Sequence, residues 1–473
     1  MSTLLWFRAI VCQILLVALV SSTTKIWPLP MKVAEKDTVW SIDPENLKIS
    51  VSRPCEIIKE AIKRYRKKFC YNTKPPKSAK EKSVTFIFEL CVLLAYFQSW
   101  GALRALESFD QLIYYDKNLG CCIDEVIIYD KPRFPHRGID SRHYLSLNAL
   151  KATLELMAQN KFNVFHWHIV DEQAFPYASR VAKEFQKGAY SPKHIYTINQ
   201  VKYARLRGIR VIPEFDTPGH THSWGIGYPE LLTRCFKDDG DEDPYRSLID
   251  PSKEHSYDII LNFLFDLQET FEVFPDRYFH LGGDEAEFWI KECWQNNKNI
   301  TNFMQMEIFG NNFSFQEVFD SGFAKDGLVA HVWKGNNEQE QMSEVAKITK
   351  LGYRTLLSSC WYLDHIARRA DWLDYYSCDP QKFNGTETQK ELVLGGEAAL
   401  WGEWVDDSNV ISRLFPRASA IAERLWSDPT MTSNSTAAWP RCDICRMKRQ
   451  GYPVQPVNGP GFCEIEYQTE LPV

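Results

Sequence analysis

The stretch "SLNALKATLELMAQNKFNVFHWHIVDE", residues 146–172, holds one complete unit of the pattern that decides the fold. In its first half, four apolar side chains recur at helical spacing, which predicts an amphipathic helix with one buried face; they are Leu147, Leu150, Leu154 and Met157. The apolar run 162–170 follows at once and predicts a buried strand. Two acids, Asp171 and Glu172, close the run. The unit therefore predicts a helix followed by a buried strand that ends in polar residues.

Seven further β-rich runs lie on either side of this unit, and helical or polar stretches separate most of them. The runs cover residues 133–140, 208–216, 276–285, 313–320, 327–333, 353–359 and 392–403. Eight such runs predict an α/β protein with a (β/α)8 TIM barrel over residues 132–473, which is ample because such barrels need roughly 250 residues. No helical pattern joins the fifth run to the sixth, so we expect the barrel to be irregular there.

The carboxyl ends of the runs carry polar and aromatic side chains, and in such barrels these ends form the active site. The residues at these ends are Asp140, Arg142, Asp171, Glu172, Asp216, His220, Asp284, Glu285, Trp333, Tyr362, Asp364, Trp401 and Glu403. Their convergence on one mouth of the barrel is the main indication of function.

Residues 1–22 have the features of a secretory signal peptide. Arg8 precedes an apolar segment at 9–20, and small polar residues follow at 21–24, where cleavage is expected. The apolar segment is short for a membrane span, so a signal peptide is preferred over a membrane anchor. The chain has 13 cysteines, and removal of Cys12 with the signal peptide leaves 12 that can form disulfides in the secretory pathway, where four sequon asparagines can also be glycosylated. These asparagines are Asn299, Asn312, Asn384 and Asn434.

Composition and motifs exclude several other classes of protein. A net charge of −6 gives no sign of a nucleic-acid-binding surface. There is no GxSxG motif, so a serine nucleophile is not expected, and the isolated "CDIC" lacks the second pair that structural zinc needs. His166 and His168 share one face of the second run and could begin a zinc site. Without an HExxH motif, buried and hydrogen-bonded structural histidines are the preferred interpretation.

The motif "YFHLGGDEAEFW", residues 278–289, places two adjacent carboxylates, Asp284 and Glu285, after two glycines. The acids could bind a metal, divide the acid–base work of glycoside cleavage, or cap the helix that follows. Adjacent side chains on an ideal strand face opposite ways, but Gly282 and Gly283 could relax that geometry and turn both acids toward the mouth. The aromatic and acidic strand ends around them favour acid–base work.

Many separate stretches, all in order, resemble the retaining β-N-acetylhexosaminidase family of the lysosomal hexosaminidase type. They include "RFPHRG", "SRHYL", "NKFNVFHWHIVDEQAFPY", "YARLRGIRVIPEFDTPGHTHSWG", "FHLGGDE", "WYLDHI", "GGEAALWGEWVD" and "AERLWS". The resemblance runs from about residue 133 to the end of the chain, with "WGALRALESFDQL" just before it. It implies a small α+β domain over residues 23–131 ahead of the barrel, and neither a cofactor nor a metal is expected.

The resemblance also implies a mechanism, in which the substrate supplies its own nucleophile. The 2-acetamido oxygen of a terminal GlcNAc or GalNAc attacks the anomeric carbon and forms an oxazolinium intermediate. Glu285 matches the general acid/base, and Asp284 matches the residue that holds the acetamido N–H. Asp171 and His220 match a network that supports the acid.

Further residues that bind substrate are implied in the same way. The matches to side chains that bind sugar hydroxyls are Arg142, Asp364 and Glu403. Trp401 matches the residue that forms the floor under the sugar ring, and Trp333 matches the wall of the acetamido pocket. Tyr362 matches the residue whose hydroxyl orients the acetamido oxygen. Phe315 stands where the family has a pocket tryptophan, which keeps a stacking face but loses size and the N–H donor.

Two disulfides, Cys235–Cys293 and Cys445–Cys463, are also implied by the resemblance. Cys55 matches the first cysteine of an N-terminal pair whose second member is not evident in this sequence. Several stretches are shorter than the family pattern, including the one between "RG" and "SRHY" and the one after Glu285.

The shortened stretches and Phe315 leave a second function open, that of a secreted glycan-binding homologue with weak or no catalysis. A chitinase is a weaker option because its differently spaced acidic motif is absent. The expected partners are oligosaccharide, glycoprotein or glycolipid glycans with a terminal N-acetylhexosamine, and a homodimer is possible. The expected location is the lysosome or the extracellular space.

Overall fold

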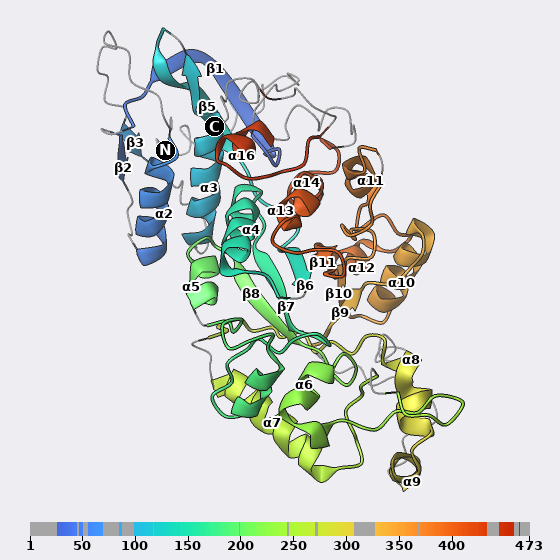
Figure 1. Cartoon of the computed structure of the whole chain (residues 1–473). Helices are drawn as coiled ribbons and strands as arrows, with labels where there is room; N and C mark the ends of the chain where they lie inside the picture. The colour runs from blue at the N-terminus through green and yellow to red at the C-terminus, as the bar shows by residue number, and fades with distance from the viewer. Residues whose placement is uncertain are drawn as a thin grey trace, which may run out of the picture. The chain divides into compact units, whose positions relative to one another are not determined.

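The computed structural model describes residues 26–44, 47–50, 55–69, 85–87, 99–116, 118–142, 144–197, 199–243, 246–269, 273–306, 327–367, 369–432, 444–457 and 463. The chain divides into two compact units, which are considered separately (Figure 1). The first unit takes in the chain up to Arg133 and residues 426–443. The second unit comprises Phe134–Leu425 and the chain from Ile444 onward. The predicted signal peptide at 1–22, the fifth β run, Phe315, Asn312 and Asn434 lie outside the described residues.

The N-terminal unit combines strands and helices, as an α+β domain does. Its antiparallel sheet has β5 (Gly120–Tyr129) in the middle, between β1 (Lys32–Ser41) and β4 (Tyr114–Asp116). The other elements are the short parallel pair β2 (Lys48–Ser50) and β3 (Thr85–Ile87) and the helices α2 (Glu56–Arg66) and α3 (Ser99–Leu112).

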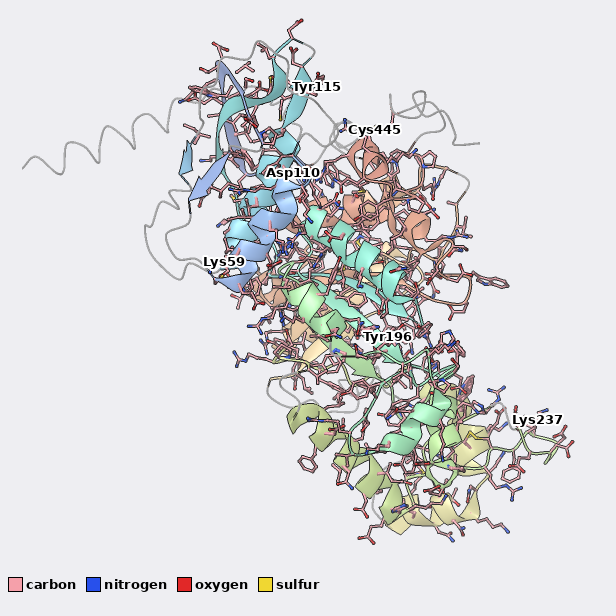
Figure 2. All side chains as sticks on the ribbon, turned by 60° about the vertical axis from the view of Figure 1, so that its left-hand side comes forward. Lys59, Asp110, Tyr115, Tyr196, Lys237 and Cys445 are labelled. Carbon is pink, nitrogen blue, oxygen red and sulfur yellow. A yellow bond between two sulfur atoms is a disulfide. The ribbon has the colours of Figure 1, made fainter. Side chains whose placement is uncertain are left out.

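A shared apolar core joins the two helices of this unit. Ile58 and Tyr65 of α2 and Leu103 and Leu106 of α3 belong to the same buried cluster. The opposite face of α2 is basic and exposed, as Lys59 shows (Figure 2). This division of apolar and charged faces is what a surface helix requires.

The second unit is built on a six-stranded parallel sheet in the order β8-β7-β6-β11-β10-β9. These strands are β8 (Arg210–Phe215), β7 (Val164–Val170), β6 (His136–Arg142), β11 (Val393–Leu400), β10 (Arg354–Leu357) and β9 (Val329–Val332). They correspond to the third, second, first, eighth, seventh and sixth predicted runs. The eighth run pairs with the first, with Gly395 opposite His136 and Leu400 opposite Ser141. Pairing of the last strand with the first is the closure that defines a (β/α)8 barrel.

The fourth predicted run is the exception among the runs that are described. It forms no strand and joins the sheet only through an isolated bridge between His280 and Glu214. Gly282 and Gly283 have φ values of +67° and +97°, which leave the β region and end the ladder. The described residues therefore form the curled part of a barrel and not a complete one. The predicted fold class, an irregular (β/α)8 barrel behind a small α+β domain, is confirmed.

Helices connect the strands of the second unit and cover its sheet (Figure 1). The longer ones are α4 (Leu147–Gln159), α7 (Glu254–Glu269), α10 (Glu338–Lys350) and α14 (Arg417–Trp426). The shorter ones are α5 (Asn199–Arg205), α6 (His222–Gly227), α8 (Ala286–Ile290), α9 (Lys298–Met306), α11 (Trp372–Ser377), α12 (Glu387–Glu391), α13 (Val410–Leu414) and α16 (Ile444–Arg449).

Helix α4 is the helix predicted by the opening stretch, and its Ser146 cap accepts a hydrogen bond from the backbone N–H of Ala149. Leu150, Leu154 and Met157 are buried, as predicted. Leu147 is 39% exposed, so the prediction was wrong at this position. It is the first residue of the helix, where one side is still open to solvent. Among the described residues, none of the helices combines the length and apolarity that a membrane span needs.

Candidate active site

Asp284 and Glu285 lie where the fourth run meets α8. Glu285 occupies the N-cap position of α8 with φ +59°, and its side chain makes no capping hydrogen bond. Gly282 approaches Asp216 so closely that a Cβ atom there would clash with Asp216 Oδ1. The capping interpretation is therefore wrong for Glu285, whose side chain occupies the N-cap position without bonding to the helix.

An apolar cluster and a disulfide hold the segment that follows Glu285. Ala286 at the start of α8 is fully buried, together with Ile290 and Cys293. Cys293 lies in the π-helical turn Lys291–Gln295 and is bonded to Cys235. The buried cluster and the disulfide thus hold in place the backbone that directly follows the two acids.

A chain of three side chains runs from Glu285 into the barrel. His220 Nε2 lies 3.5 Å from Glu285 Oε2 and 3.9 Å from Asp284 Oδ2, and His220 Nδ1 lies 3.3 Å from Asp171 Oδ1. Asp171 directly follows β7, and His220 has a left-handed backbone with φ +55°. A non-glycine residue in that region is uncommon, and such residues occur where a side chain must be aimed. The predicted residues Asp171, His220, Asp284 and Glu285 are thus brought together.

The charge of His220 follows from these neighbours. Burial alone lowers its pKa, but the hydrogen bonds to Asp171 and Glu285 and the charge of Asp216 outweigh burial and raise it to about 11. His220 is therefore cationic at neutral and acidic pH. This places a positive charge 3.5 Å from Glu285 Oε2.

Arg142 joins the same network from the end of β6. Its Nε donates to Asp171 Oδ2, and its guanidinium carbon lies 5.0 Å from the centre of the Trp401 ring. Its Nη1 lies 4.0 Å from Glu403 Oε1. Burial lowers the pKa of Arg142, but the Asp171 carboxylate more than reverses this. Arg142 is therefore a fixed cation between Asp171 and the mouth.

The aromatic residues form a second group, beyond the carboxyl ends of β9, β10 and β11. The Tyr362 hydroxyl donates to the Trp333 carbonyl at 2.9 Å, and the Tyr362 and Trp401 rings lie 5.4 Å apart, edge to face. Burial raises the pKa of Tyr362 above its ordinary value, so its hydroxyl stays protonated. Asp364 Oδ2 lies 3.8 Å from His365 Nε2.

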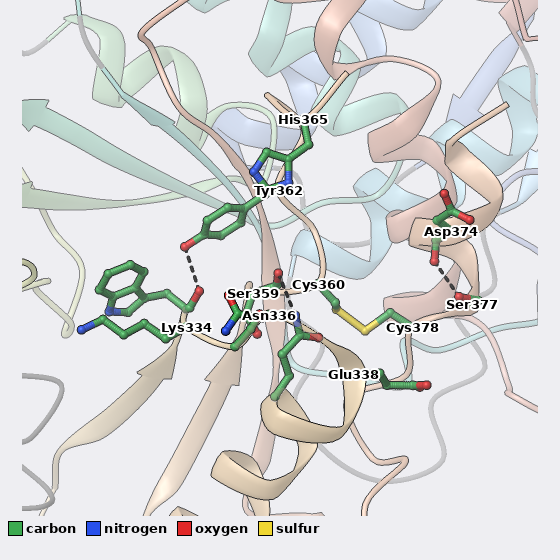
Figure 3. Close-up of a pocket in the computed structure, with 13 residues that line it drawn as sticks. Lys334, Asn336, Glu338, Ser359, Cys360, Tyr362, His365, Asp374, Ser377 and Cys378 are labelled. Carbon is green, nitrogen blue, oxygen red and sulfur yellow. Dashed lines mark hydrogen bonds between the residues drawn. A yellow bond between two sulfur atoms is a disulfide. The ribbon is translucent and has the colours of Figure 1, made fainter. Parts of the chain in front are cut away.

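A cavity of about 590 Å³ adjoins this aromatic group. Trp333 and Tyr362 line it, and its wall continues along the Cys360–Cys378 disulfide (Figure 3). Its volume is within the range of small-molecule sites. Glu285, Asp284 and Arg142 do not line this cavity, so among the described residues the carboxylates and the cavity are separate features.

Asp216 is a member of the site to which the sequence assigned no role. It is fully buried at the end of β8 and accepts a hydrogen bond from the backbone N–H of Gly283 at 2.8 Å. Burial and the nearby charges of Asp284 and Glu214 raise its pKa well above the ordinary value. Through this hydrogen bond, the Asp216 carboxyl fixes the glycine turn that precedes Asp284. Its position at a strand end was the only available sign in the sequence.

His166 and His168 belong to a polar cluster inside the barrel. His166 Nδ1 lies 2.8 Å from Glu397 Oε2, and its Nε2 lies 2.7 Å from Glu214 Oε2. His168 Nδ1 lies 3.4 Å from Glu214, and burial lowers the pKa of His168 to about 4. Both histidines are buried, which agrees with a structural role.

Nitrogen atoms of His166, His280 and His331 lie close enough together to bind a metal ion. However, the ring nitrogens of His280 and His331 also have protein partners. His280 Nδ1 lies 2.8 Å from Glu214, His280 Nε2 lies 3.2 Å from His331 Nδ1, and His331 Nε2 lies 2.8 Å from Ser358 Oγ. These contacts favour a proton-sharing structural cluster over a metal site.

Among the described residues, three disulfides have both partners defined. Cys235–Cys293 and Cys445–Cys463 are the implied pairs, and Cys360–Cys378 was not expected. The Cys55 assignment was wrong, because its thiol is free and lies 3.3 Å from Ser99 Oγ. Cys121 of the N-terminal unit is disulfide-bonded instead. The sequon residues Asn299 and Asn384 are both exposed.

Residues 134–320 and 310–429 match the family described as Glycosyl hydrolase family 20, catalytic domain. Since this match covers more than half of the chain, the protein belongs to glycosyl hydrolase family 20.

Individual relatives extend over nearly the whole chain. It is 40% identical to Beta-hexosaminidase A of Caenorhabditis elegans, with 93% of this chain and 92% of that one covered. It is 41% identical to Beta-hexosaminidase subunit beta of Rattus norvegicus, with 94% of each covered. The solved chitobiase of Flavobacterium johnsoniae is 27% identical, with a TM-score of 0.74 over 90% of this chain and 73% of that one. The first alignment spans 516 positions, more than the 473 residues here, so the relative holds segments that this chain lacks.

Proposed function

We propose that the protein is an exo-acting, retaining β-N-acetylhexosaminidase that removes terminal GlcNAc or GalNAc by substrate-assisted catalysis. The observation that carries this proposal is the unequal environment of two adjacent acids. Glu285 lies 3.5 Å from a histidine that Asp171 supports, whereas Asp284 lies beside the buried Asp216. Membership in glycosyl hydrolase family 20 and the names of the relatives support the same activity.

In the first step, Glu285 donates its proton to the glycosidic oxygen while the acetamido oxygen of the substrate attacks the anomeric carbon. The bond between the anomeric carbon and the leaving oxygen breaks, and a cyclic oxazolinium ion forms. Asp284 accepts the acetamido N–H and stabilises the positive charge that develops. In the second step, Glu285 takes a proton from water, and the water oxygen attacks the anomeric carbon. The bond from the anomeric carbon to the oxazolinium oxygen breaks, which regenerates the acetamido group, and the anomeric configuration is retained.

The cationic His220 suits this exchange of roles at Glu285. Each time Glu285 gives up its proton, the nearby imidazolium stabilises the carboxylate that results. Asp171 keeps His220 charged and oriented, because it receives hydrogen bonds from both His220 and Arg142.

The remaining site residues would bind the terminal sugar. Arg142, Asp364 and Glu403 would hold its hydroxyls, and Trp401 would support its ring. Trp333 and Tyr362 would enclose the acetamido group, with Phe315 as a further pocket residue. The mutual contacts of Trp333, Tyr362 and Trp401 support this assignment.

The decisive experiment is hydrolysis of an aryl N-acetyl-β-glucosaminide at acidic pH by the purified protein. Turnover is expected, and Glu285→Gln should abolish it because the proton donor is lost. A thiazoline mimic of the oxazolinium ion should inhibit the active protein. A well-folded protein without turnover would refute the activity, and turnover that the thiazoline does not inhibit would refute substrate assistance.

A secreted glycan-binding protein with weak or no catalysis is the second candidate. The observation that favours it is the set of segments that the relatives have and this chain lacks. It predicts that N-acetylglucosamine binds, as measured by calorimetry, without hydrolysis of the aryl glycoside. Measurable turnover that disappears in Glu285→Gln would exclude it.

Glycans of oligosaccharides, glycoproteins or glycolipids with a terminal N-acetylhexosamine are the proposed substrates. The three disulfides support synthesis in the secretory pathway, with a signal peptide at 1–22 and delivery to the lysosome or the extracellular space. We retain the division into a small domain at 23–131 and a barrel at 132–473, glycosylation at the four sequons and a homodimer as predictions. Intact-mass and light-scattering measurements of the secreted protein test the last two.

A further inference from the structure

The segment that carries Tyr362 is attached to α11 at three points. A disulfide joins Cys360 to Cys378, the residue directly after α11 (Figure 3). Trp361 Nε1 donates to the Tyr375 carbonyl at 3.0 Å. In the opposite direction, the Tyr375 hydroxyl donates to the Tyr362 carbonyl at 2.8 Å. One covalent bond and two hydrogen bonds therefore connect three consecutive residues to a single short helix.

The other side of this segment is attached to the barrel. The Leu363 N–H donates to the Ala399 carbonyl at 2.8 Å, and the Ala399 N–H donates to the Trp361 carbonyl at 3.0 Å. Tyr362 thus lies between β11 and α11, with its backbone restrained from both sides. Its side chain extends from this restrained backbone to the Trp333 carbonyl (Figure 3).

Burial makes these attachments stiff. Trp361 is fully buried, and Tyr375 and Cys378 are 8% and 5% exposed. Water therefore does not compete for the buried hydrogen bond of Trp361, which is stronger in such surroundings than at the surface. The bond from the Tyr375 hydroxyl is part-buried, and without it the Tyr362 carbonyl would lose the side-chain donor that connects it to α11.

We infer that α11, through Tyr375 and the Cys360–Cys378 disulfide, is a positioning device for the Tyr362 hydroxyl in the acetamido pocket. This inference rests on the proposed function, in which Tyr362 orients the oxygen that attacks. Because the acetamido oxygen is the nucleophile, a small displacement of its partner lowers the rate of the chemical step more than it lowers binding of the whole sugar. Tyr375 is a positioning residue, since it acts through Tyr362 and does not line the cavity. The Cys360–Cys378 disulfide restrains Tyr362 and also forms part of the cavity wall, so Tyr375→Phe is the variant that tests positioning alone.

A purely structural disulfide predicts a different result. Its removal would lower the free energy of unfolding and leave the properties of the folded protein unchanged. The chain offers a matched control in Cys445–Cys463, which closes the same sequence separation of 18 residues as Cys360–Cys378.

The experiment compares Cys360→Ser/Cys378→Ser and Tyr375→Phe with the wild type and with Cys445→Ser/Cys463→Ser. Steady-state kinetics use the aryl N-acetylglucosaminide, and calorimetry measures binding of the thiazoline and of an iminosugar without an acetamido group. We expect kcat to fall about tenfold or more in Cys360→Ser/Cys378→Ser, because misplacing a reacting group is costly. In Tyr375→Phe we expect a fall of about two- to tenfold, the effect of one hydrogen bond. In both variants thiazoline affinity should fall by a similar factor, while KM and iminosugar affinity stay close to wild type.

An unchanged kcat and thiazoline affinity in the folded variants would overturn the inference. Equal weakening of both ligands, or the same pattern in Cys445→Ser/Cys463→Ser, would overturn it as well, because either points to general loosening. If Cys360→Ser/Cys378→Ser does not fold, Tyr375→Phe decides by the same criteria, since it keeps the ring and the carbonyl that binds Trp361. Failure of the wild type to hydrolyse the glycoside would refute the proposed function, while the ratio of the two ligand affinities would still test the role of α11.

Discussion

Replacement of Asp140 by asparagine should remove a large part of the pH dependence of stability of the catalytic unit. Asp140 lies on β6 and is 2% exposed. The distance from its Oδ1 to His166 Nδ1 is 3.8 Å. Burial and the charges of Glu214 and Glu397 raise its pKa, against the opposing effect of His166, from 3.8 to about 7. The folded protein therefore keeps a proton on Asp140 at pH values where the unfolded chain has lost it.

The sign and size of the effect follow from this difference. Because the folded state holds a proton on Asp140 that the unfolded chain has lost, the contribution of Asp140 to the free energy of unfolding is highest below pH 4 and falls as the pH rises toward 7. Each pH unit changes it by about 1.4 kcal/mol, so the whole window accounts for about 4 kcal/mol. Asparagine cannot ionise and resembles the protonated acid. Asp140→Asn should therefore match the wild type near pH 4 and exceed its stability by up to about 4 kcal/mol above pH 7.

Denaturant unfolding at half-unit steps from pH 4.5 to 8, followed by the fluorescence of the 15 tryptophans, measures this difference. Asp241→Asn, a substitution at an exposed aspartate of the same unit, is the matched control. Parallel curves for Asp140→Asn and the wild type, or a variant that is less stable at pH 7.5, would contradict the reasoning. The expected result would mean that the barrel interior favours acidic surroundings, where the proposed activity is to be assayed.

Three further substitutions test the site. Arg142→Lys should raise KM for the aryl glycoside about tenfold, because lysine lacks the planar fork that reaches Asp171 and a sugar together; an unchanged KM in steady-state kinetics would count against that role. Gly282→Ala should lower the free energy of unfolding by more than the roughly 1–3 kcal/mol of backbone strain, since its Cβ also meets Asp216 Oδ1. Gly352→Ala, with φ +87° and no atom within 4 Å of the added Cβ, measures strain alone, and equal losses in denaturant unfolding would disprove the clash. Asp171→Asn should lower the pKa of His220 from its value of about 11. The contribution of His220 to the free energy of unfolding, which is complete below pH 6.5, is then lost at a lower pH as the pH rises. An unchanged His220 titration in histidine NMR would show that Asp171 is not the cause of the raised pKa.

The helix α4 and the strand β7 could be predicted from sequence because their burial leaves a clear apolar pattern. In α4 the buried side chains of Leu150, Leu154 and Met157 recur at helical spacing, whereas every residue of β7 within the apolar run 162–170 is buried. The fourth run shows the limit of this argument. Its apolar residues are typical of a strand, but the positive φ values at Gly282 and Gly283 end the ladder, and a glycine in sequence does not state its φ.

The site residues came from strand ends and from the family resemblance, whereas contacts through space could not be predicted. The bond between Asp216 and the Gly283 N–H joins positions 67 residues apart. Likewise, nothing in the spacing of Cys360 and Cys378 selects that pair among the available cysteines. Such features depend on how the loops pack at the mouth, and packing follows from the tertiary structure as a whole.

The pairing of β11 with β6 has a consequence for the synthesis of the protein. His136 on β6 finds its carboxylate partner Glu397 only 261 residues later in the chain. At a translation rate of about 5–20 residues per second, β6 waits on the order of ten seconds or more for the strand that completes its surroundings. During that interval one edge of the nascent sheet keeps unpaired backbone N–H and C=O groups, the kind of exposed edge that favours aggregation. The last quarter of the chain is thus the part whose truncation leaves every earlier strand without closure.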